Sequence, residues 1–547
     1  MISKNTENIN IFIIVSLSII FCACFFCNHA NITTDFGREV LIPVEILNGQ
    51  ILYRDILNIY GPLSYYINSL AILIFGKNLY TFYTIGSINC IIFSLLLYKI
   101  GIRFLNKQLS LYSSLLISVY CMYGFGLYDF QHPYTYAVTY GLTFAAFSLL
   151  YFLKFHETEN NGYLCVSAFF AGLSVCCKIE FLPLLFLYAV ILFLCKFDYK
   201  RTIVFLFSFL LPFSVFLIPV VQGMNFADIK NAAGIILKEV SAPSVLHFSK
   251  LTGSYFSASE FLFGVIQTLI SFAIFYVLYL IFKNFIRRKI VLFCLSVFPF
   301  MAALILFSGR EFSLLPFIIL IAVIVLIIKK ADIKYLILSG VALACSCKTF
   351  FSLNLNAYGT YTLPLLLLTL IVLYNMSGEK IREEYTKYLI ILLLAIKIIP
   401  VITLYSEYNF SVKTDKGIIK SSKIWADGIN DYIDFTAKNT DSSDKILHLQ
   451  EGALLNFLTE RKTNMKYYAL NLPYIETYGR NKIIEAISKF QYITLINGFG
   501  NYYFGKGNIY FENNEITEYI RNNFKVVFSY KNGDDIILFL KKKQNEH

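Results

Sequence analysis

The chain of 547 residues is 57% hydrophobic and 17% aromatic, only 15% of it is charged, and its mean hydropathy is +0.62. These values lie far outside those of soluble globular domains and predict a polytopic α-helical membrane protein. The net charge of +12 would suggest a nucleic-acid partner for a soluble domain, but here Lys and Arg stand in short clusters between apolar segments. Such clusters set membrane topology, so no nucleic-acid partner is expected.

Apolar segments long enough to cross, or nearly cross, a bilayer core of about 30 Å recur along most of the chain. They are residues 9–27, 79–98, 109–125, 135–153, 163–177, 181–195, 203–221, 260–282, 290–307, 313–328, 335–347, 359–376 and 388–405. We therefore expect about thirteen transmembrane helices within a membrane domain of residues 1–405.

The loops between these segments alternate in charge. One set is rich in Lys and Arg and is expected on the cytoplasmic side: residues 99–107, 196–201, 283–289, 329–334 and 380–387. The other set is expected outside and comprises a long first loop, residues 28–78, and residues 126–134, 222–259, 309–311 and 348–358. Because the number of spans is odd, the region after residue 405 is expected outside as well.

Residues 406–547 are charged, rich in Asn and no longer continuously apolar, so we expect a small extracytoplasmic α/β domain there. Helical spacing covers residues 422–438, 451–460, 479–489 and 514–523. Residues 445–449 and 492–497 have the pattern of buried strands, and residues 525–530 and 535–540 flank Asn532-Gly533, a β-hairpin signal.

Polar side chains that would be costly inside a helix bundle gather at the outward ends of these spans. The candidate site residues are Asp35, Arg38, Glu39, Asp55 and Tyr60 in the first loop, Asp129 and His132 in the next outer loop, Lys178 and Glu180 after residues 163–177, and Arg310 and Lys348 further on. If the segment is helical, Asp35 and Glu39 share a face with Arg38 beside them. Because all of these candidate residues are expected on the outer side of the membrane, we predict that they line one cavity that faces the outer leaflet.

This set combines carboxylates that can act as a base with cations that can hold a phosphate. A lipid-linked phosphate suits such a site, since its tail lies in the bilayer and its headgroup reaches the polar helix ends. In sugar transfer from such a lipid, a carboxylate deprotonates the acceptor hydroxyl and fixed positive charge stabilises the departing phosphate. Structural roles are the alternative: Asp35 as a helix cap, Lys178 and Glu180 as an ion pair.

Motifs around these residues resemble a known family. Asp35-x-Gly37-Arg38-Glu39, followed by Tyr53-Arg54-Asp55 and Tyr60-Gly61-Pro62, is similar to the first outer loop of bacterial C-type (GT-C) glycosyltransferases of family 39. That superfamily includes protein O-mannosyltransferases and lipid A aminoarabinose transferases. The resemblance continues at residues 132–134, 178–183, 309–311 and 361–365, and residues 451–458 are similar to the small outer domain of bacterial members.

The resemblance implies an enzyme of the bacterial cytoplasmic membrane that moves a sugar from a polyprenyl-phosphate donor to a glycan, lipid or protein outside the cytoplasm. It also implies that Asp35 is the base, while Glu39 is a second catalytic carboxylate or a partner of Arg38. Asp129 would orient the acceptor or a divalent metal. Arg38, Lys178, Arg310 and Lys348 are the expected phosphate contacts.

Two other functions fit the same polar set. A polysaccharide polymerase or ligase would consume a diphosphate-linked oligosaccharide at the outer face. A lipid-linked glycan flippase would bind the headgroup in transit without catalysis, but it should carry polar residues on both sides of the bilayer midplane.

Overall fold

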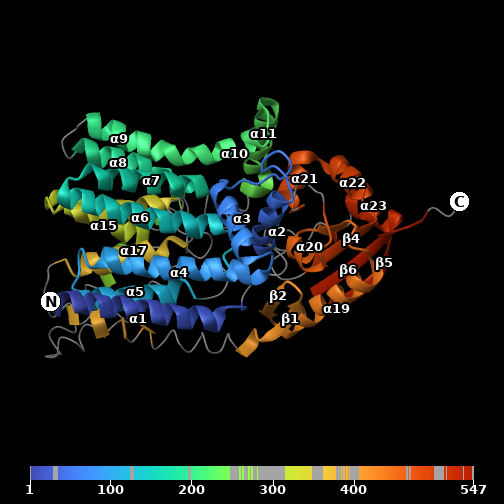
Figure 1. Ribbon diagram of the computed structural model, residues 1–547, viewed down its shortest axis with the longest axis horizontal. Coiled ribbons are helices and arrows are strands. Elements are labelled where there is room, and N and C mark those ends of the chain that lie inside the picture. Colours follow the sequence, from blue (N-terminus) through green and yellow to red (C-terminus); the bar gives the residue numbers. More distant parts are fainter. Residues whose placement is uncertain are drawn as a thin grey trace.

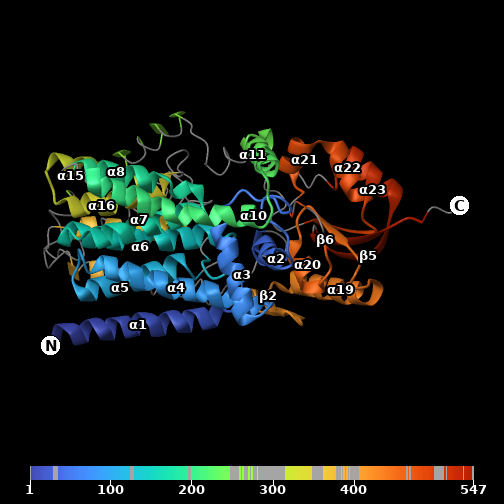
Figure 2. The ribbon, with the colours of Figure 1, turned by 45° about the horizontal axis from the view of Figure 1, so that its top comes forward.

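A helical bundle and a smaller α/β domain lie end to end in the computed structural model of the chain (Figures 1 and 2). The structure describes residues 2–28, 35–123, 129–194, 199–246, 315–347, 361–376, 406–463, 470–497 and 510–544, apart from residues 513 and 534. It also describes isolated positions between 258 and 280, between 383 and 394, and at 466 and 468.

Most of the expected spans are helices of the bundle. They are α1 (Ile2–Phe25), α4 (Leu79–Gly101), α5 (Lys107–Cys121), α6 (Tyr136–Thr158), α7 (Asn161–Cys177), α8 (Pro183–Leu194), α15 (Leu315–Ile328), α16 (Ile333–Cys345) and α17 (Leu363–Tyr374). The span expected at 203–221 begins as α9 (Tyr199–Leu210) and continues through a 3-10 segment, η3 (Leu211–Leu217), into α10 (Ile218–Val221). Pro212 and Pro219 explain this change of winding, because proline removes a helical N–H donor.

Fewer described helices meet the length and apolarity needed to cross a membrane than the sequence analysis expected. Within the described residues, four helices are long and apolar enough to cross a membrane, at residues 5–25, 79–101, 136–158 and 199–221. Helices α7, α8, α15, α16 and α17 are apolar but shorter. The spans expected at 260–282, 290–307 and 388–405 fall largely outside the described residues, so the figure of about thirteen stays a prediction.

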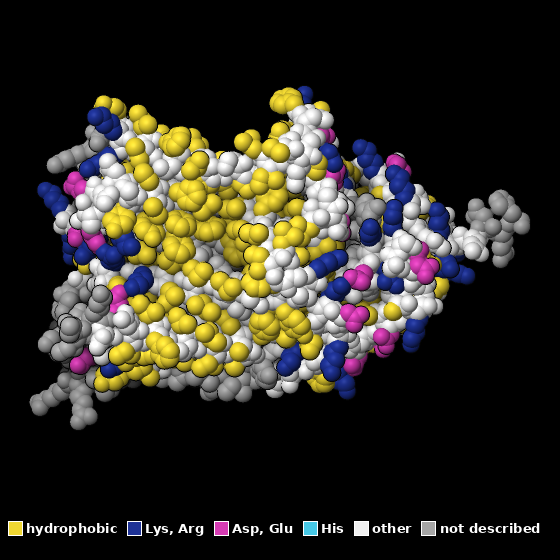
Figure 3. Space-filling model, viewed as in Figure 1, with side chains coloured by type: hydrophobic (Ala, Val, Ile, Leu, Met, Phe, Trp, Pro, Cys, Tyr) yellow, Lys and Arg dark blue, Asp and Glu magenta, His cyan; other side chains and the backbone are white. Residues whose placement is uncertain are grey.

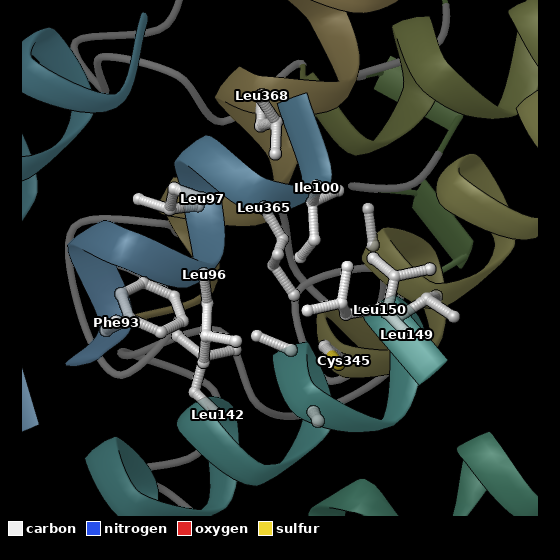
Figure 4. Packing of buried hydrophobic residues seen from close by; sticks show 14 of the residues in the cluster. Phe93, Leu96, Leu97, Ile100, Leu142, Leu149, Leu150, Cys345, Leu365 and Leu368 are labelled. Carbon is white, nitrogen blue, oxygen red and sulfur yellow. The ribbon is translucent and has the colours of Figure 1, made fainter. Parts of the chain in front are cut away.

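The bundle is packed through one large apolar core. In Figure 4, Ile100 of α4, Leu149 and Leu150 of α6, Cys345 of α16 and Leu365 of α17 lie together, all of them buried. Apolar side chains also cover the face of the bundle that Figure 3 shows, and Lys and Arg gather at the end far from the α/β domain. A belt of this kind is what a lipid bilayer requires.

The first outer loop contains two helices that the sequence analysis did not assign. They are α2 (Asp35–Leu47) and α3 (Leu63–Phe75), which lie between the bundle and the α/β domain (Figure 2). A third unassigned helix, α11 (Phe226–Val240), lies in the loop expected at 222–259. Charged residues interrupt the apolar pattern of α2 in the sequence. In the structure, its apolar side chains are covered by the C-terminal domain as well as by the bundle.

The C-terminal region has the expected mixed α/β structure. Its elements are β1 (Phe410–Thr414), β2 (Gly417–Ser421), α19 (Lys423–Asn439), β3 (Ile446–Leu449), α20 (Ala453–Thr459), α21 (Leu472–Tyr478), α22 (Arg480–Ser488), β4 (Tyr492–Asn497), α23 (Glu515–Asn523), β5 (Phe524–Asn532) and β6 (Asp535–Lys542). The strand order is β3-β4-β6-β5, with β3 and β4 parallel and the other pairs antiparallel. All expected helices and strands are confirmed, whereas the β1–β2 hairpin and α21 were not foreseen.

The C-terminal domain packs directly on one end of the bundle. The amide of Leu79 donates to the carbonyl oxygen of Lys416 at 2.7 Å, and the amide of Lys420 donates to that of Cys27 at 2.7 Å. Phe36 of α2 and Leu454 of α20 belong to the same buried cluster. A Cβ atom on Gly37 would lie 2.3 Å from the backbone nitrogen of Leu454, so only glycine permits this approach of α2 and α20.

Candidate active site

The first turn of α2 carries an ion pair at the junction of the two domains. Arg38 donates to Asp35 at the i, i+3 spacing of one helix turn, and the two side chains keep 20% and 23% of their surfaces exposed. Burial raises the pKa of the Asp35 carboxyl, and the charge of Arg38 opposes that rise. Asp35 is therefore a carboxylate that is within reach of solvent and has an increased tendency to accept a proton.

Glu39 lies one turn further along α2 and faces a different set of partners. Its carboxylate accepts the amide of Tyr136 at 2.9 Å and the hydroxyl of Tyr65 at 3.1 Å, and the residue is only 1% exposed. Tyr136 is the first residue of α6, where the helix dipole favours a negative charge. Burial raises the pKa of Glu39 to about 7. These contacts hold α2 against the start of α6.

Lys178, Glu180 and Tyr60 form a second polar group. Lys178 donates to the Tyr134 hydroxyl at 2.6 Å, pairs with Glu180 at 3.0 Å and lies 5.3 Å from the ring centre of Tyr60. Gly61 brings Tyr60 to this position, since its amide donates to the Cys177 carbonyl oxygen at 3.0 Å. A Cβ atom on Gly61 would lie 2.0 Å from the Cys176 carbonyl oxygen.

An apolar cavity of about 510 Å³ adjoins the Lys178 group. Its walls come from the first loop, α7, η3 and α11, and include Tyr60, Gly61, Val175, Phe216, Leu217 and Ile236. Tyr60 belongs to this wall and also interacts electrostatically with Arg38. Tyr60 thus belongs to the cavity wall, lies under Lys178 and acts electrostatically on Arg38.

Asp129 and His132 are sealed inside the protein. One Asp129 oxygen accepts the amides of Gln131 and His132 at 2.8 Å each, and the other lies 3.1 Å from Nδ1 of His132. Nε2 of His132 lies 3.1 Å from the Phe26 carbonyl oxygen, and its ring packs edge-on against Tyr83. Their side chains are 4% and 0% exposed, so these contacts fix a loop to the end of α1.

The remaining candidates are placed as follows. Asp55 accepts two bonds from Arg54, at 2.8 and 2.9 Å, and one from the Ile51 amide at 2.8 Å, which closes a turn of the first loop. The Arg54 hydrogen bonds lower the pKa of Asp55. Arg310 and Lys348 lie outside the described residues, so their expected phosphate contacts stay predictions.

The sequence analysis did not include two further carboxylates that interact with Arg38. They are Glu239 of α11 and Glu451, which follows β3 in the C-terminal domain, and both interact electrostatically with Arg38. Tyr474 of α21 interacts with both of them. The motif at residues 451–458 was the only signal for Glu451, and no sequence pattern distinguished Glu239 from an ordinary surface residue of a helix.

No metal site is evident in the described part of the chain. Among those residues, no three His, Cys, Asp or Glu side chains are grouped so that they could hold a metal ion. Asp129, which was expected to orient the acceptor or a divalent metal, instead contacts two backbone amides and the His132 ring.

Comparison with known proteins gives one family match and several structural matches. Residues 60–221 match the family model described as dolichyl-phosphate-mannose-protein mannosyltransferase. No curated protein matches the chain in sequence. The matched segment contains Tyr60, Asp129, His132, Lys178 and Glu180, and it ends before the C-terminal domain.

Among solved structures, the apo oligosaccharyltransferase of Archaeoglobus fulgidus aligns over 98% of this chain and 75% of its own, at 11% identity and a TM-score of 0.52. ArnT from Cupriavidus metallidurans bound to undecaprenyl phosphate aligns over 96% and 97% of the two chains, at 10% identity and a TM-score of 0.47. The archaeal enzyme AglB in complex with an inhibitory peptide and a dolichol-phosphate aligns over 98% and 74%, at 11% identity and a TM-score of 0.43. The chain therefore has the fold of the archaeal oligosaccharyltransferase, and its residues 60–221 are similar to the mannosyltransferase family.

Proposed function

We propose that the chain transfers a sugar from a polyprenyl-phosphate donor to an acceptor hydroxyl outside the cytoplasm, with Asp35 as the base. The observation that carries this proposal is the position of the Asp35–Arg38 pair, which neighbours the Lys178 group and the apolar cavity of about 510 Å³. A charged site beside an apolar cavity suits a substrate that has a phosphate at one end and a hydrocarbon chain at the other.

The donor would bind along the cavity wall with its phosphate toward Tyr60. Lys178 lies over the Tyr60 ring, and Arg38 interacts with the same tyrosine, so two cations flank this point. Fixed positive charge in a largely buried place stabilises a phosphate leaving group far more than it would in water. The description of the matched family model names a dolichyl-phosphate sugar, which supports the same donor class.

In the proposed reaction, the Asp35 carboxylate takes the proton of the acceptor hydroxyl. The acceptor oxygen then forms a bond to the anomeric carbon while the bond from that carbon to the phosphate oxygen breaks. The electron pair stays with the polyprenyl phosphate, whose added charge Arg38 and Lys178 offset. Attack opposite the leaving group inverts the anomeric centre. Glu39, whose oxygens already accept two hydrogen bonds, supports α2 in this scheme.

The test is sugar transfer by the purified protein in lipid from a panel of radiolabelled polyprenyl-phosphate sugars. Asp35→Asn removes the base at nearly constant volume, so transfer should fall by about 10²–10⁴-fold. Asp427→Asn, on the exposed side of α19, is the matched control and should transfer at the wild-type rate.

A folded Asp35→Asn protein with wild-type transfer would contradict the proposed base. If no monophosphate donor reacts while a diphosphate-linked oligosaccharide is consumed, the chain is a polymerase or ligase instead. Binding of that oligosaccharide without consumption would favour the flippase.

A further inference from the structure

Glu451 places a carboxylate of the C-terminal domain at the proposed site. It follows strand β3 and precedes α20, with Gly452 between them in a conformation that only glycine adopts readily (φ 158°). One carboxylate oxygen accepts the side-chain amide of Asn471 at 3.3 Å. The other oxygen, Oε2, is buried and has no hydrogen-bond partner among the described residues.

An unpaired buried carboxylate oxygen destabilises a fold unless a charge or a function compensates it. The groups that act on Glu451 electrostatically are Arg38 and Asp35 of α2. Arg38 is in turn influenced by Tyr60 of the first loop and Tyr474 of α21, and Glu239 of α11 also interacts with Arg38. Burial raises the pKa of Glu451 to about 7, Arg38 opposes that rise, and Asp35 adds to it.

The position of Glu451 is fixed by the contact between α2 and α20. Gly37 precedes Arg38, and Leu454 lies three residues after Glu451, so the close approach of Gly37 to the Leu454 backbone brings Arg38 and Glu451 together. Docking of the C-terminal domain in this way therefore brings Glu451 under the electrostatic influence of Arg38.

We propose that Glu451 is a positioning residue of the active site, which shares the Arg38 guanidinium with Asp35 and so completes the site when the C-terminal domain is docked. This inference rests on the proposed function of Asp35 as the base. Because Arg38 serves two carboxylates, it neutralises Asp35 less completely, and Asp35 remains a stronger base. Without Glu451, Arg38 would be fully available to Asp35 and would weaken it.

The first measurement is the pH dependence of kcat/KM for transfer, since its acidic limb reports the ionisation of the base. In Glu451→Gln we expect this limb to move to lower pH by roughly one unit, because the base loses a neighbouring negative charge. We also expect kcat to fall several-fold. Glu460→Gln, in the same domain and paired with Lys416 at the surface, is the matched control and should keep the wild-type profile.

The second measurement needs no activity. Thermal unfolding at pH 8 is compared for the wild type, Asp35→Asn, Glu451→Gln and the double variant. If the two carboxylates share one guanidinium, the shifts in Tm are not additive, because removing either one frees Arg38 for the other. Gln keeps the oxygen that accepts from Asn471, so Glu451→Gln should remain folded.

A wild-type pH profile for Glu451→Gln, or additive shifts in Tm, would overturn the sharing of Arg38. Absence of transfer in the wild-type protein would instead contradict the proposed function, and the unfolding series would then decide the inference by itself.

Discussion

Two acid–base pairs of the chain illustrate how similar residues serve different purposes. Asp35 and Arg38 are joined by one ion pair, and about a fifth of each side chain is exposed. Asp129 and His132 are also three residues apart and also in contact, but their side chains are 4% and 0% exposed. The first pair can meet a substrate, whereas the second can meet only its own neighbours.

The difference comes from the number of hydrogen bonds that each carboxylate already makes. Asp129 accepts two backbone amides, and its second oxygen contacts His132. Asp35 has Arg38 as its only ion-pair partner within the described residues, and this partner also interacts with Glu451 and Tyr60. A carboxylate with unused bonding capacity, beside a shared cation, is better suited to accept a proton from a substrate.

The largest effect outside the base itself is expected at Lys178. Lys178→Met removes the cation beside Tyr60 and the cavity, and transfer should fall by roughly 10²-fold because the leaving phosphate loses charge stabilisation. The measurement is kcat and KM for the donor with purified protein in lipid. Lys178→Arg, which keeps the charge, should recover part of the loss.

Lys154→Met is the control for that variant, since Lys154 lies over the Tyr151 ring on α6 and outside the proposed site. Equal losses in Lys154→Met and Lys178→Met would mean that Lys178 acts by packing and not by its charge.

Asp129→Asn is expected to lower the stability of the protein while leaving its transfer activity nearly unchanged. The Asn oxygen can still accept from both backbone N–H groups, but an NH2 donor replaces the charged oxygen that faces the His132 ring, so we expect the free energy of unfolding to fall by about 1–3 kcal/mol. Transfer per folded molecule should stay within about threefold of the wild type, because no substrate reaches this buried pair. Thermal unfolding and the transfer assay on the same preparation measure both quantities.

A stable Asp129→Asn protein that had lost transfer would reverse the comparison. Asp129 would then be part of the reacting site, as the sequence analysis expected, and the described arrangement would represent a closed state.

The bundle and the C-terminal strands could be predicted because their sequence patterns are local. A long apolar run such as residues 79–98, or a turn such as Asn532-Gly533, specifies its structure without help from distant residues. Helix α2 could not be predicted in the same way, since its buried face forms only against α20, more than four hundred residues further along the chain.

The sequence predicted which residue types would make up the candidate site, but it did not predict which of these residues lie close together. The sequence placed Asp35, Arg38 and Lys178 at the outer surface because charge is costly in the bilayer. It could not separate Asp35 from Asp129, since both are acidic residues of outer loops. The role of Glu451 depends on domain docking, because Glu451 belongs to the C-terminal domain and Arg38, which acts on it electrostatically, belongs to α2.

Glu39 provides the finest test of the comparison, because it combines burial with a place on the same helix as Asp35. Burial raises its pKa from 4.5 to about 7, so ionising it in the folded protein is unfavourable. Its stabilising contribution is therefore present below pH 4.5 and is lost as the pH rises through 7. Glu39→Gln lacks this ionisation, and its amide oxygen can still accept from the Tyr136 amide.

We expect the stability of Glu39→Gln relative to the wild type to increase between pH 5 and pH 8. The increase in the free energy of unfolding should be on the order of 1–3 kcal/mol, and it should appear as a higher relative Tm. Thermal unfolding of both proteins across that pH range measures this change. The pH dependence that other buried carboxyls contribute is the same in both proteins and cancels when the two are subtracted. A constant difference would mean that Glu39 is already ionised in the folded protein at pH 5. In that case the Tyr136 and Tyr65 bonds outweigh burial, and Glu39 would resemble Asp129, a carboxylate held by its neighbours, more than Asp35.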